Sequence, residues 1–347
     1  MRPETEADLA RIIRAARAPL RITGGATRRW PGEGRGEVLD ITGLSGVTLY
    51  EPEALTLTVR AGTPLDVVQQ TLAAEGQMLG FEPPGDPGST MGGVVATNAS
   101  GPRRVQLGAA RDALIGLRMI DGQGNLIRNG GRVMKNVTGY DLVKLMAGSR
   151  GRLGVLTELT FRTAPLPPVR ATLCLPDLDA PAAIPALTLA LSGAFDVAGA
   201  AWSPRHGALI RLEGLAGSVA GRATALSDRL SRFGTLTRRD DDPWPCLLHP
   251  NIHDPALDTW RIICRPSAAT ALLTHLPEPL LLDWGGALIH IALPAGELPP
   301  LPPFAGHARR ITGAIPAVLP APDPVTARLE RDLRAGFDPR GIFQGDD

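Results

Sequence analysis

Glycine-rich stretches beside hydroxyl-bearing residues carry the clearest chemical signal in this chain. One stretch, PGDPGSTMGG, runs from Pro84 to Gly93. Its prolines stiffen the loop, and its glycines allow a backbone to approach a ligand closely or to take positive φ. The small residues over 94–99 predict a helix whose first N–H groups face the loop, which is typical of an anion site. A lone cluster of this kind is more often a connection between a strand and a buried helix.

Further glycine-rich stretches follow or precede predicted strands. Gly24 and Gly25 come directly after a predicted strand over 19–23 and are followed by the hydroxyl of Thr27. This pattern is typical of a phosphate loop, although a tight turn explains it equally well. Two more stretches, over 130–142 and 148–155, are also rich in glycine. Several such loops within one domain indicate a single extended ligand threaded through it.

Regular elements are expected on both sides of these loops. Apolar periodicity and turn residues predict a helix over 5–18, strands over 38–41, 47–50 and 55–60, a helix from Pro64 to Gly76, a hairpin of 114–120 with 126–128, a short helix ending at Met146 and a strand over 155–163. The PLPP stretch from Pro165 to Pro168 reads as a linker. The first domain is therefore expected to span residues 1–167.

Two β-α-β-β units are expected in the second half of the chain. The predicted elements are strands over 170–175, 198–202, 207–213, 258–264, 280–284 and 287–292, with helices over 180–191, 217–233 and 267–276. They indicate an antiparallel sheet backed by helices, over residues 168–293. Residues 294–347 are expected to form a third segment, with an irregular proline-rich part over 294–325 and a last helix over 325–335.

Composition excludes several classes of protein. The chain has 347 residues, 44% of them hydrophobic, and a net charge of +1 at pH 7. Nucleic acid is therefore not an expected partner, and no apolar run reaches membrane-spanning length. Cys174, Cys246 and Cys264 lie far apart without a CxxC pair, which argues against a metal site, a cluster or a disulfide framework. No signal peptide is visible, so we expect a cytoplasmic protein that reaches a membrane only through partner subunits.

The motifs together resemble a known family of flavoproteins. Thr23-Gly24-Gly25, the Pro84–Gly93 loop, Thr97–Gly101, the Lys135–Leu142 motif and Gly154–Glu158 resemble the FAD-binding domain of the vanillyl-alcohol-oxidase and p-cresol-methylhydroxylase superfamily. Within that superfamily, the chain is most similar to the FAD-binding subunits of bacterial glycolate oxidases. The resemblance implies an α+β fold, with a two-subdomain PCMH-type FAD-binding domain followed by an antiparallel-sheet α+β cap domain.

The same resemblance implies FAD, which we expect to be bound non-covalently, and a set of residues that contact it. The implied contacts are Thr23, Gly24, Gly25, Ala26, Thr27, Pro84, Gly85, Asp86, Ser89, Thr90, Gly92, Gly93, Thr97, Asn98, Lys135, Asn136, Gly139, Asp141, Gly154 and Val155. A surface ion pair is an alternative reading of Lys135 and Asp141. Many relatives attach FAD through a histidine or cysteine, but the first cysteine here is Cys174 and the first histidine is His206. A covalent link from within the flavin domain is therefore excluded.

Oxidation of a 2-hydroxy acid also needs residues for the carboxylate and for the hydroxyl proton. Arg211, Arg261 and His290 lie in the otherwise apolar predicted strands of the second domain. We expect Arg261 and His290 to be the catalytic candidates. A solvated sheet face or a packed core histidine is an equally good reading of these two residues.

Relatives of this kind act with a second flavin subunit and an iron–sulfur subunit, so such partners are implied here. Three readings stay open: a glycolate-oxidising subunit that also accepts D-lactate, a non-catalytic relay or scaffolding flavin subunit, and a stand-alone oxidase of another hydroxy acid or alcohol. The end of the chain, FDPRGIFQGDD from Phe337, departs from the Phe-Asn-Pro-Gly segment common in relatives. This departure leaves open whether the tail packs on the flavin domain.

Overall fold

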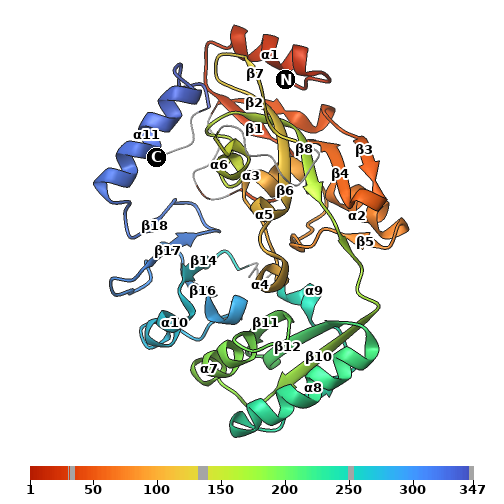
Figure 1. The fold of residues 1–347 in the computed structure, drawn as a ribbon. Helices are drawn as coiled ribbons and strands as arrows, with labels where there is room; N and C mark the ends of the chain where they lie inside the picture. The colour runs from red at the N-terminus through yellow and green to blue at the C-terminus, as the bar shows by residue number, and fades with distance from the viewer. Residues whose placement is uncertain (30, 32–35, 132–139, 249–253, 344–347) are drawn as a thin grey trace. The chain divides into compact units, whose positions relative to one another are not determined.

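The chain forms two compact units. The computed structural model describes residues 1–29, 31, 36–131, 140–248 and 254–343. Unit 1 comprises residues 1–100, 108–166 and 322–347, and unit 2 comprises residues 101–107 and 167–321 (Figure 1). Each unit therefore includes a segment that is distant in sequence from its main part.

Unit 1 contains two sheets of different character. A short parallel pair joins β1 (Leu20–Thr23) to β2 (Glu37–Asp40). A separate antiparallel sheet has the strand order β3-β4-β8-β6-β7. Its strands are β3 (Val47–Glu51), β4 (Thr56–Arg60), β6 (Leu114–Ile120), β7 (Leu126–Gly130) and β8 (Val155–Arg162). These two sheets are the two subdomains that the sequence predicts for the flavin domain.

Short helices complete unit 1, and a small antiparallel pair joins β5 (Gln77–Met78) to β9 (Ala164–Pro165). The helices are α1 (Glu6–Ala15), α2 (Leu65–Ala74), α3 (Met91–Ala96), α5 (Ala110–Ala113), α6 (Leu142–Met146) and α11 (Pro324–Phe337). Thr5 caps α1 by accepting a hydrogen bond from the N–H of Asp8 at 3.1 Å.

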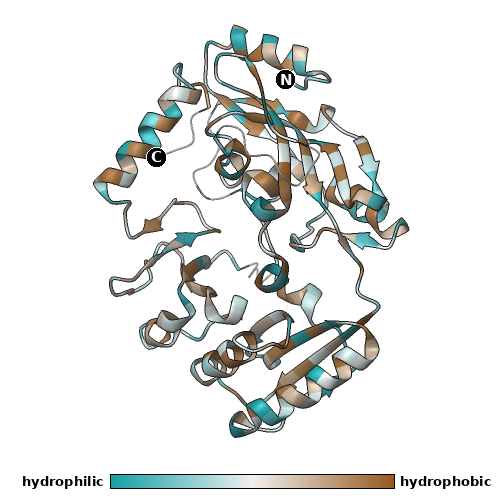
Figure 2. Cartoon of the chain, viewed as in Figure 1, coloured by the Kyte–Doolittle hydropathy of each residue, from teal (hydrophilic) through white to brown (hydrophobic). Residues whose placement is uncertain are grey.

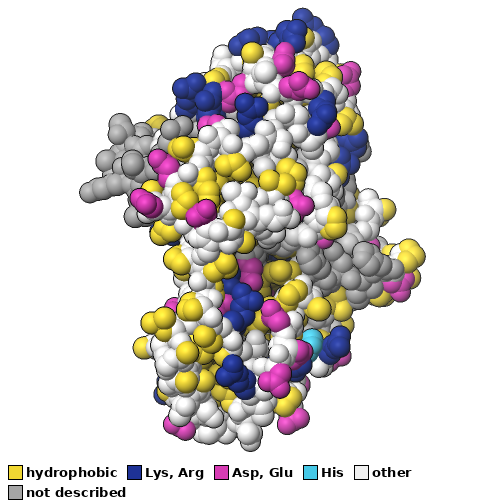
Figure 3. Space-filling model, turned by 90° about the vertical axis from the view of Figure 1, so that its right-hand side faces the viewer, with side chains coloured by type: hydrophobic (Ala, Val, Ile, Leu, Met, Phe, Trp, Pro, Cys, Tyr) yellow, Lys and Arg dark blue, Asp and Glu magenta, His cyan; other side chains and the backbone are white. Residues whose placement is uncertain are grey.

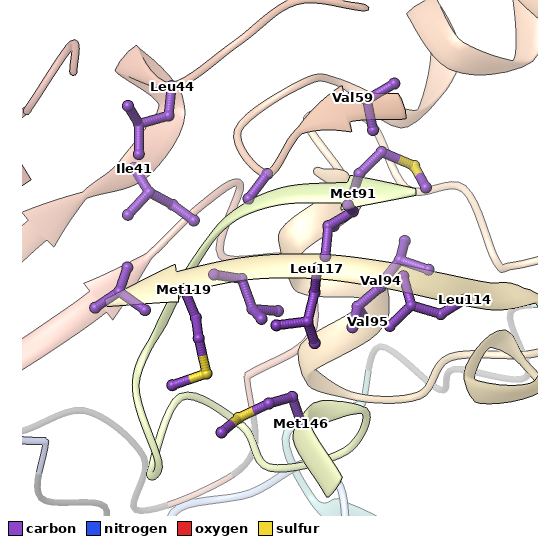
Figure 4. Close-up of a cluster of buried hydrophobic side chains, with 14 of the residues drawn as sticks. Ile41, Leu44, Val59, Met91, Val94, Val95, Leu114, Leu117, Met119 and Met146 are labelled. Atoms are coloured by element: carbon purple, nitrogen blue, oxygen red, sulfur yellow. The ribbon is translucent and has the colours of Figure 1, made fainter. Parts of the chain in front are cut away.

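The core of unit 1 lies between α3 and the five-stranded sheet. Met91, Val94 and Val95 of α3 are fully buried beside Leu117 and Met119 of β6 (Figure 4). Burial of each such side chain contributes about 2 kcal/mol to stability. The small residues that the sequence shows after the glycine-rich loop thus serve to seat a short helix on a sheet.

Unit 2 is a nine-stranded antiparallel sheet with α7, α8 and α10 on one face and α9 on the other. The strand order is β13-β10-β12-β11-β15-β16-β14-β17-β18. The strands are β10 (Val169–Leu175), β11 (Val197–Ser203), β12 (Gly207–Gly214), β13 (Thr237–Arg239), β14 (Leu257–Cys264), β15 (Leu281–Asp283), β16 (Leu288–Pro294), β17 (Gly306–Arg310) and β18 (Val318–Leu319). The helices are α4 (Arg104–Leu107), α7 (Ala180–Leu191), α8 (Ala216–Leu230), α9 (Trp244–Leu247) and α10 (Pro266–Leu273). The antiparallel sheet backed by helices agrees with the sequence prediction.

The two faces of this sheet differ in chemistry. One face is apolar and packs against α7, α8 and α10, with Ile210, Trp260 and Ile289 in its core. Figure 2 shows the apolar residues of these strands in brown and the mixed surface of α8. Because side chains alternate along a strand, Arg211, Glu213, Arg261 and His290 point to the opposite face.

The units divide the chain differently from the three ranges expected from sequence. The proline-rich stretch over 294–325 is expected to be irregular, but it contains β17 and β18, which extend the sheet of unit 2. The sequence analysis misses these strands because the surrounding residues are rich in proline and because β18 has only two residues. On the face in Figure 3, basic and acidic side chains are interspersed, in keeping with a net charge of +1.

The shortened C-terminal tail does pack on unit 1. The N–H of Leu20 in β1 donates to the carbonyl of Ile342 at 2.7 Å, and the N–H of Phe343 donates to Asp338 Oδ2 at 2.6 Å. Arg340 donates to the carbonyl of Ile13 at 3.1 Å, near the C-terminal end of α1. Ile342 and Phe343 are buried in the core of unit 1.

Substitution of Phe343 tests whether the tail stabilises unit 1. We expect Phe343→Ala to lower the free energy of unfolding by about 3 kcal/mol, because it leaves a cavity in the core. Leu329→Ala, in an exposed position of α11, should change it by less than about 0.5 kcal/mol. Urea denaturation of both variants measures the difference. Equal stability of the two variants would contradict a supporting role for the tail.

Candidate functional site

A pocket in unit 1 gathers residues from most of the glycine-rich loops. It includes the predicted cofactor contacts Thr23, Gly24, Gly25, Ala26, Thr27, Thr90, Gly92, Gly93, Thr97 and Gly154. It also includes residues that the sequence analysis does not select, namely Ile22, Arg28, Arg29, Ile41, Ala96, Arg150, Gly151 and Leu156. The loops after β1, before α3 and before β8 therefore converge on one cavity.

Glycine is required where the loop after β1 meets the loop before α3. A Cβ atom added to Gly25 would lie 1.6 Å from the carbonyl oxygen of Gly88. A Cβ atom on Gly24 would lie 2.3 Å from Thr90 Oγ1. Gly25 therefore allows the two loops to touch backbone to backbone, and Gly24 leaves room for the side chain of Thr90.

The N-terminus of α3 does not offer the free N–H groups that the sequence predicts. The N–H of Met91 donates to the carbonyl of Thr63 at 3.0 Å, and that of Gly92 donates to the carbonyl of Ala61 at 2.6 Å. The N–H of Gly93 donates to Thr90 Oγ1 at 3.3 Å. This expectation is wrong because carbonyl groups just after β4 already accept the first donors of the helix.

The loop after β1 offers donors instead. Among the hydrogen bonds between described residues, none is donated by the backbone N–H groups of Gly24, Gly25, Ala26 or Thr27. Ala26 takes a positive φ of 56°, which turns successive N–H groups in a concave arc. Such an arc is a nest that favours a phosphate or another anion.

Three arginines line the same pocket and add positive charge. Arg28 donates to Ser89 Oγ and to the carbonyl of Pro84, so it links the loop after β1 to the loop before α3. Arg150 donates to the carbonyl of Arg28 at 2.6 Å, and Arg29 donates to Thr23 Oγ1 at 3.0 Å. Burial lowers the pKa of Arg28, and the nearby Asp86 opposes this shift.

Other predicted contacts in the loop before α3 lie outside the pocket lining. Pro84 and Ser89 accept hydrogen bonds from Arg28, and Asp86 is close enough to affect its pKa. Gly85 lies beside Leu65, since a Cβ atom added to Gly85 would lie 3.8 Å from Leu65 Cδ2. Pro84, Asp86 and Ser89 therefore brace the arginine that enters the pocket.

The remaining predicted contacts have other positions. Asn98 Oδ1 accepts a hydrogen bond from the N–H of Arg111 at 2.9 Å, and Asp141 caps α6 by accepting from the N–H of Lys144 at 3.0 Å. Val155 is buried in β8 opposite Ile120. Lys135, Asn136 and Gly139 lie outside the described residues.

Unit 2 brings Arg261 and His290 together on two neighbouring strands, a juxtaposition that the sequence analysis does not predict. Arg261 on β14 is the direct cross-strand partner of His290 on β16 and of Arg309 on β17. Directly opposed side chains have Cβ atoms about 5 Å apart. Two guanidinium groups and an imidazole thus form a row across three strands.

His290 is neutral and has an unsatisfied ring nitrogen. The residue is 7% exposed, and among the described residues its Nδ1 has no hydrogen-bond partner. Burial, together with the charge of Arg261, lowers the pKa of His290 to about 3. A buried polar atom without a partner is costly in a protein, which indicates a position where a ligand supplies the missing hydrogen bond.

Arg211, the other arginine on this face, has a structural role. It is fully buried, and its guanidinium lies 4.6 Å from the centre of the Trp244 ring. Its Nη2 donates to the carbonyl of Ala198 at 3.1 Å, and its Nε lies 3.5 Å from Glu213 Oε1. These contacts hold α9 and β12 together and leave Arg211 out of the candidate site.

The described part of the chain lacks two other features that would bear on function. None of its helices is long and apolar enough to cross a membrane. No group of three or more His, Cys, Asp or Glu side chains there could hold a metal ion.

Comparison with known proteins identifies the family. Residues 1–130 match the family described as FAD binding domain. The glycolate oxidase subunit GlcE of Escherichia coli strain K12 is 36% identical over 351 residues, which cover 94% of this chain and 91% of GlcE. The chain belongs to the GlcE family of FAD-binding proteins. Members of this family are oxidoreductases, and the cofactor is FAD.

Two other comparisons agree with this family. A D-lactate dehydrogenase of Anaerostipes hadrus is 35% identical over 144 residues, which cover 41% of this chain and 30% of that enzyme. A solved structure of alkyldihydroxyacetonephosphate synthase aligns with a TM-score of 0.66 over 99% of this chain and 74% of that chain, at 17% identity. The latter likeness shows the PCMH-type α+β fold that the sequence predicts.

The residues of the unit 1 pocket fit the chemistry of FAD. A diphosphate needs hydrogen-bond donors and positive charge, which the loop after β1, Arg28 and Arg150 supply. The apolar side chains of Ile22, Ile41 and Leu156 suit the uncharged rings of the cofactor. The predicted contacts thus stay predictions that the geometry of this pocket favours.

Replacement of Gly25 tests the pocket. We expect Gly25→Ala to weaken FAD binding about thirtyfold, because forcing apart the two loops costs about 2 kcal/mol. Gly221→Ala in α8, where an added Cβ meets open space, should leave the FAD content unchanged. The flavin is released with acid and measured against protein. Flavin that stays with the denatured protein would show a covalent link, and full FAD content in Gly25→Ala would contradict this pocket.

The lowered pKa of His290 predicts a pH dependence of stability. Below pH 6.5 the unfolded chain binds a proton that folded His290 excludes until about pH 3, so the free energy of unfolding falls with pH in this window. Between pH 7 and pH 5 the loss from this one residue is about 2 kcal/mol. We therefore expect the free energy of unfolding of His290→Gln to fall by about 2 kcal/mol less than that of the wild type between pH 7 and pH 5. Urea denaturation at both pH values measures this difference, and identical losses would show that the pKa of His290 is not lowered in the folded protein.

Proposed function

We propose that this chain is the FAD-binding subunit of a glycolate oxidase complex and that it oxidises small 2-hydroxy acids to 2-oxo acids. The observation that carries the proposal is the cross-strand pair of Arg261 and neutral His290. The names of its relatives support the substrate class, because GlcE is a subunit of a glycolate oxidase and the Anaerostipes hadrus relative oxidises D-lactate.

Arg261 has the chemistry to bind the carboxylate of the substrate. A guanidinium donates two parallel hydrogen bonds to a carboxylate and keeps its charge at every physiological pH. Its position in the middle of β14, between two paired strands, limits its motion. The substrate would therefore be held in one orientation, with its α-carbon beside the carboxylate.

His290 has the chemistry to accept the hydroxyl proton. It is neutral at physiological pH, and its buried Nδ1 lacks a hydrogen-bond partner. The positive charge of Arg261 contributes to the low pKa of His290. A bound carboxylate offsets that charge, so substrate binding raises the basicity of the imidazole at the moment a base is needed.

Bound FAD supplies the acceptor for the two electrons and the hydrogen that leave the α-carbon as hydride. The hydroxyl proton goes to His290, and the carbon–oxygen bond becomes a carbonyl. Arg261 and His290 thus orient the substrate and take up its proton. The residues of this chain do not need to supply any further redox group for this half of the reaction.

Reoxidation of the flavin requires a route for the electrons. The three cysteines of the chain have no spacing suited to an iron–sulfur cluster. We therefore propose an iron–sulfur subunit as the acceptor, together with a second flavin subunit in the same complex. The word subunit in the name of the relative GlcE supports assembly with partners.

Anaerobic flavin reduction tests this function. The protein is purified alone and with its co-expressed neighbours, and glycolate or D-lactate is added without oxygen. We expect the flavin absorbance to bleach in the complex. His290→Gln should slow the bleaching about 100-fold or more, because it removes the base. His275→Gln, at an exposed position, serves as the matched control and should react as the wild type does.

The outcomes separate the alternative functions. Bleaching of the lone chain that depends on His290 supports catalysis in this subunit. Bleaching that occurs only in the complex and is unaffected in His290→Gln shows a relay or scaffolding role. Rapid reoxidation of the lone chain by O₂ shows a stand-alone oxidase. A purified chain without flavin would overturn the proposal.

A further inference from the structure

The segment Gly101–Leu107 leaves unit 1 and is anchored in unit 2. Its flanking residues, up to 100 and from 108, belong to unit 1. The carbonyl of Gly101 accepts a hydrogen bond from Trp284 Nε1 at 3.0 Å. Arg103 donates to both carboxylate oxygens of Glu213, at 3.0 and 2.6 Å, and both side chains are 4% exposed.

These anchors fix the position of the neighbouring Arg104. Its guanidinium lies 4.4 Å from the centre of the Trp284 ring, within the range of a cation–π contact. The guanidinium of Arg261 lies 5.5 Å from the centre of the same ring. One indole thus has two guanidinium groups around it, one from β14 and one from the 101–107 segment.

The electrostatics of this arrangement favour an anion. Guanidinium groups that converge on one ring repel each other, and Arg309 adds a third positive charge opposite Arg261. Asp283 brings one buried carboxylate to the same face of the sheet. A guanidinium group binds a carboxylate through two parallel charge-assisted hydrogen bonds, which is the chemistry that this face of the sheet offers.

Two buried polar atoms beside Arg261 point independently to a ligand. His290 Nδ1, on the cross-strand partner of Arg261, has no hydrogen-bond partner. Thr259 Oγ1, two residues before Arg261 on the same face of β14, is also buried without a partner, in a residue that is 0% exposed. A ligand hydroxyl can satisfy His290 Nδ1, the nearer of the two atoms to the cross-strand position of Arg261.

We propose that Arg104 is a second carboxylate-binding residue, which acts with Arg261 over the Trp284 ring. The two guanidinium groups bind the carboxylate of a small 2-hydroxy acid, and its hydroxyl faces Nδ1 of His290. This inference rests on the proposed function and assigns the specificity for a carboxylate to the 101–107 segment. The buried pair of Arg103 and Glu213 positions Arg104 for this contact.

Substitution of Arg104 in the assembled, FAD-loaded complex tests the inference. We expect Arg104→Gln to raise the KM for glycolate about ten- to hundredfold, because it removes a charge-assisted hydrogen bond, and to change kcat by less than about threefold. Calorimetric titration with oxamate, a carboxylate with no α-hydrogen to lose, should show the same loss in affinity. Arg104→Lys keeps the positive charge and should therefore recover part of the lost oxamate affinity.

Arg232→Gln is the matched control. Arg232 also stacks on an aromatic ring, with its guanidinium 4.7 Å from the centre of Phe233, but it lies in the 3-10 turn after α8. The control should keep the KM and the oxamate affinity of the wild type. FAD content and melting temperature should be the same in both variants.

The results distinguish failure of this inference from failure of the proposed function. If Arg104→Gln keeps the wild-type KM for glycolate and the wild-type oxamate affinity, the proposed role of Arg104 is overturned. Reduction of the flavin by glycolate would in that case still support the proposed function. A wild-type complex that no 2-hydroxy acid reduces would overturn the function, and equal oxamate affinity in wild type and variant would then overturn this inference too. If Arg104→Gln does not fold, wild-type affinity in Arg104→Lys together with wild-type affinity in Arg104→Met overturns it.

Discussion

The flavin pocket depends on the contact between two backbones at Gly25 and Gly88. A Cβ atom at Gly25 would lie 1.6 Å from the Gly88 carbonyl, so no other residue permits this approach. The contact places Arg28 where it can donate to Pro84 and Ser89. The close contact of two loops, rather than the N-terminus of a long helix, thus places the positive charge of Arg28 at the pocket.

Unit 2 contains two kinds of buried polar group on the same face of its sheet, and their hydrogen bonds distinguish them. Glu213 accepts from Arg103 and Arg170, so this cluster is internally satisfied. Breaking such a buried pair typically costs about 3–5 kcal/mol, which makes it a strong anchor. His290 and Thr259 differ because each leaves a buried polar atom without a partner. The satisfied cluster is the framework, and the unsatisfied atoms mark the place for a ligand.

Local patterns predict the elements of this fold well and the hydrogen bonds of its site poorly. Alternation gives β4, β8 and the strands that carry Arg261 and His290, and paired glycines locate the loop after β1. The free donors expected at α3 are absent because Ala61 and Thr63, about 30 residues earlier in the chain, supply acceptors. Arg28 and Arg150 escape sequence analysis for the same reason, since only the folded chain brings them together. Residues that bind through tertiary contacts carry no periodic signal.

The 101–107 segment is a short stretch of chain between a residue that lines the flavin pocket and the residue that we propose to bind the substrate. Thr97 lines the flavin pocket, and Arg104 lies seven residues later on the Trp284 ring. Both ends of the segment are tied within unit 1, because Asn98 accepts from the N–H of Arg111 and Ser100 accepts from the N–H of Ala110. Its middle is tied within unit 2 by Arg103. A substitution that breaks either set of hydrogen bonds would therefore affect two groups of residues through the same short stretch of chain. One group would hold the cofactor, and the other would hold the substrate.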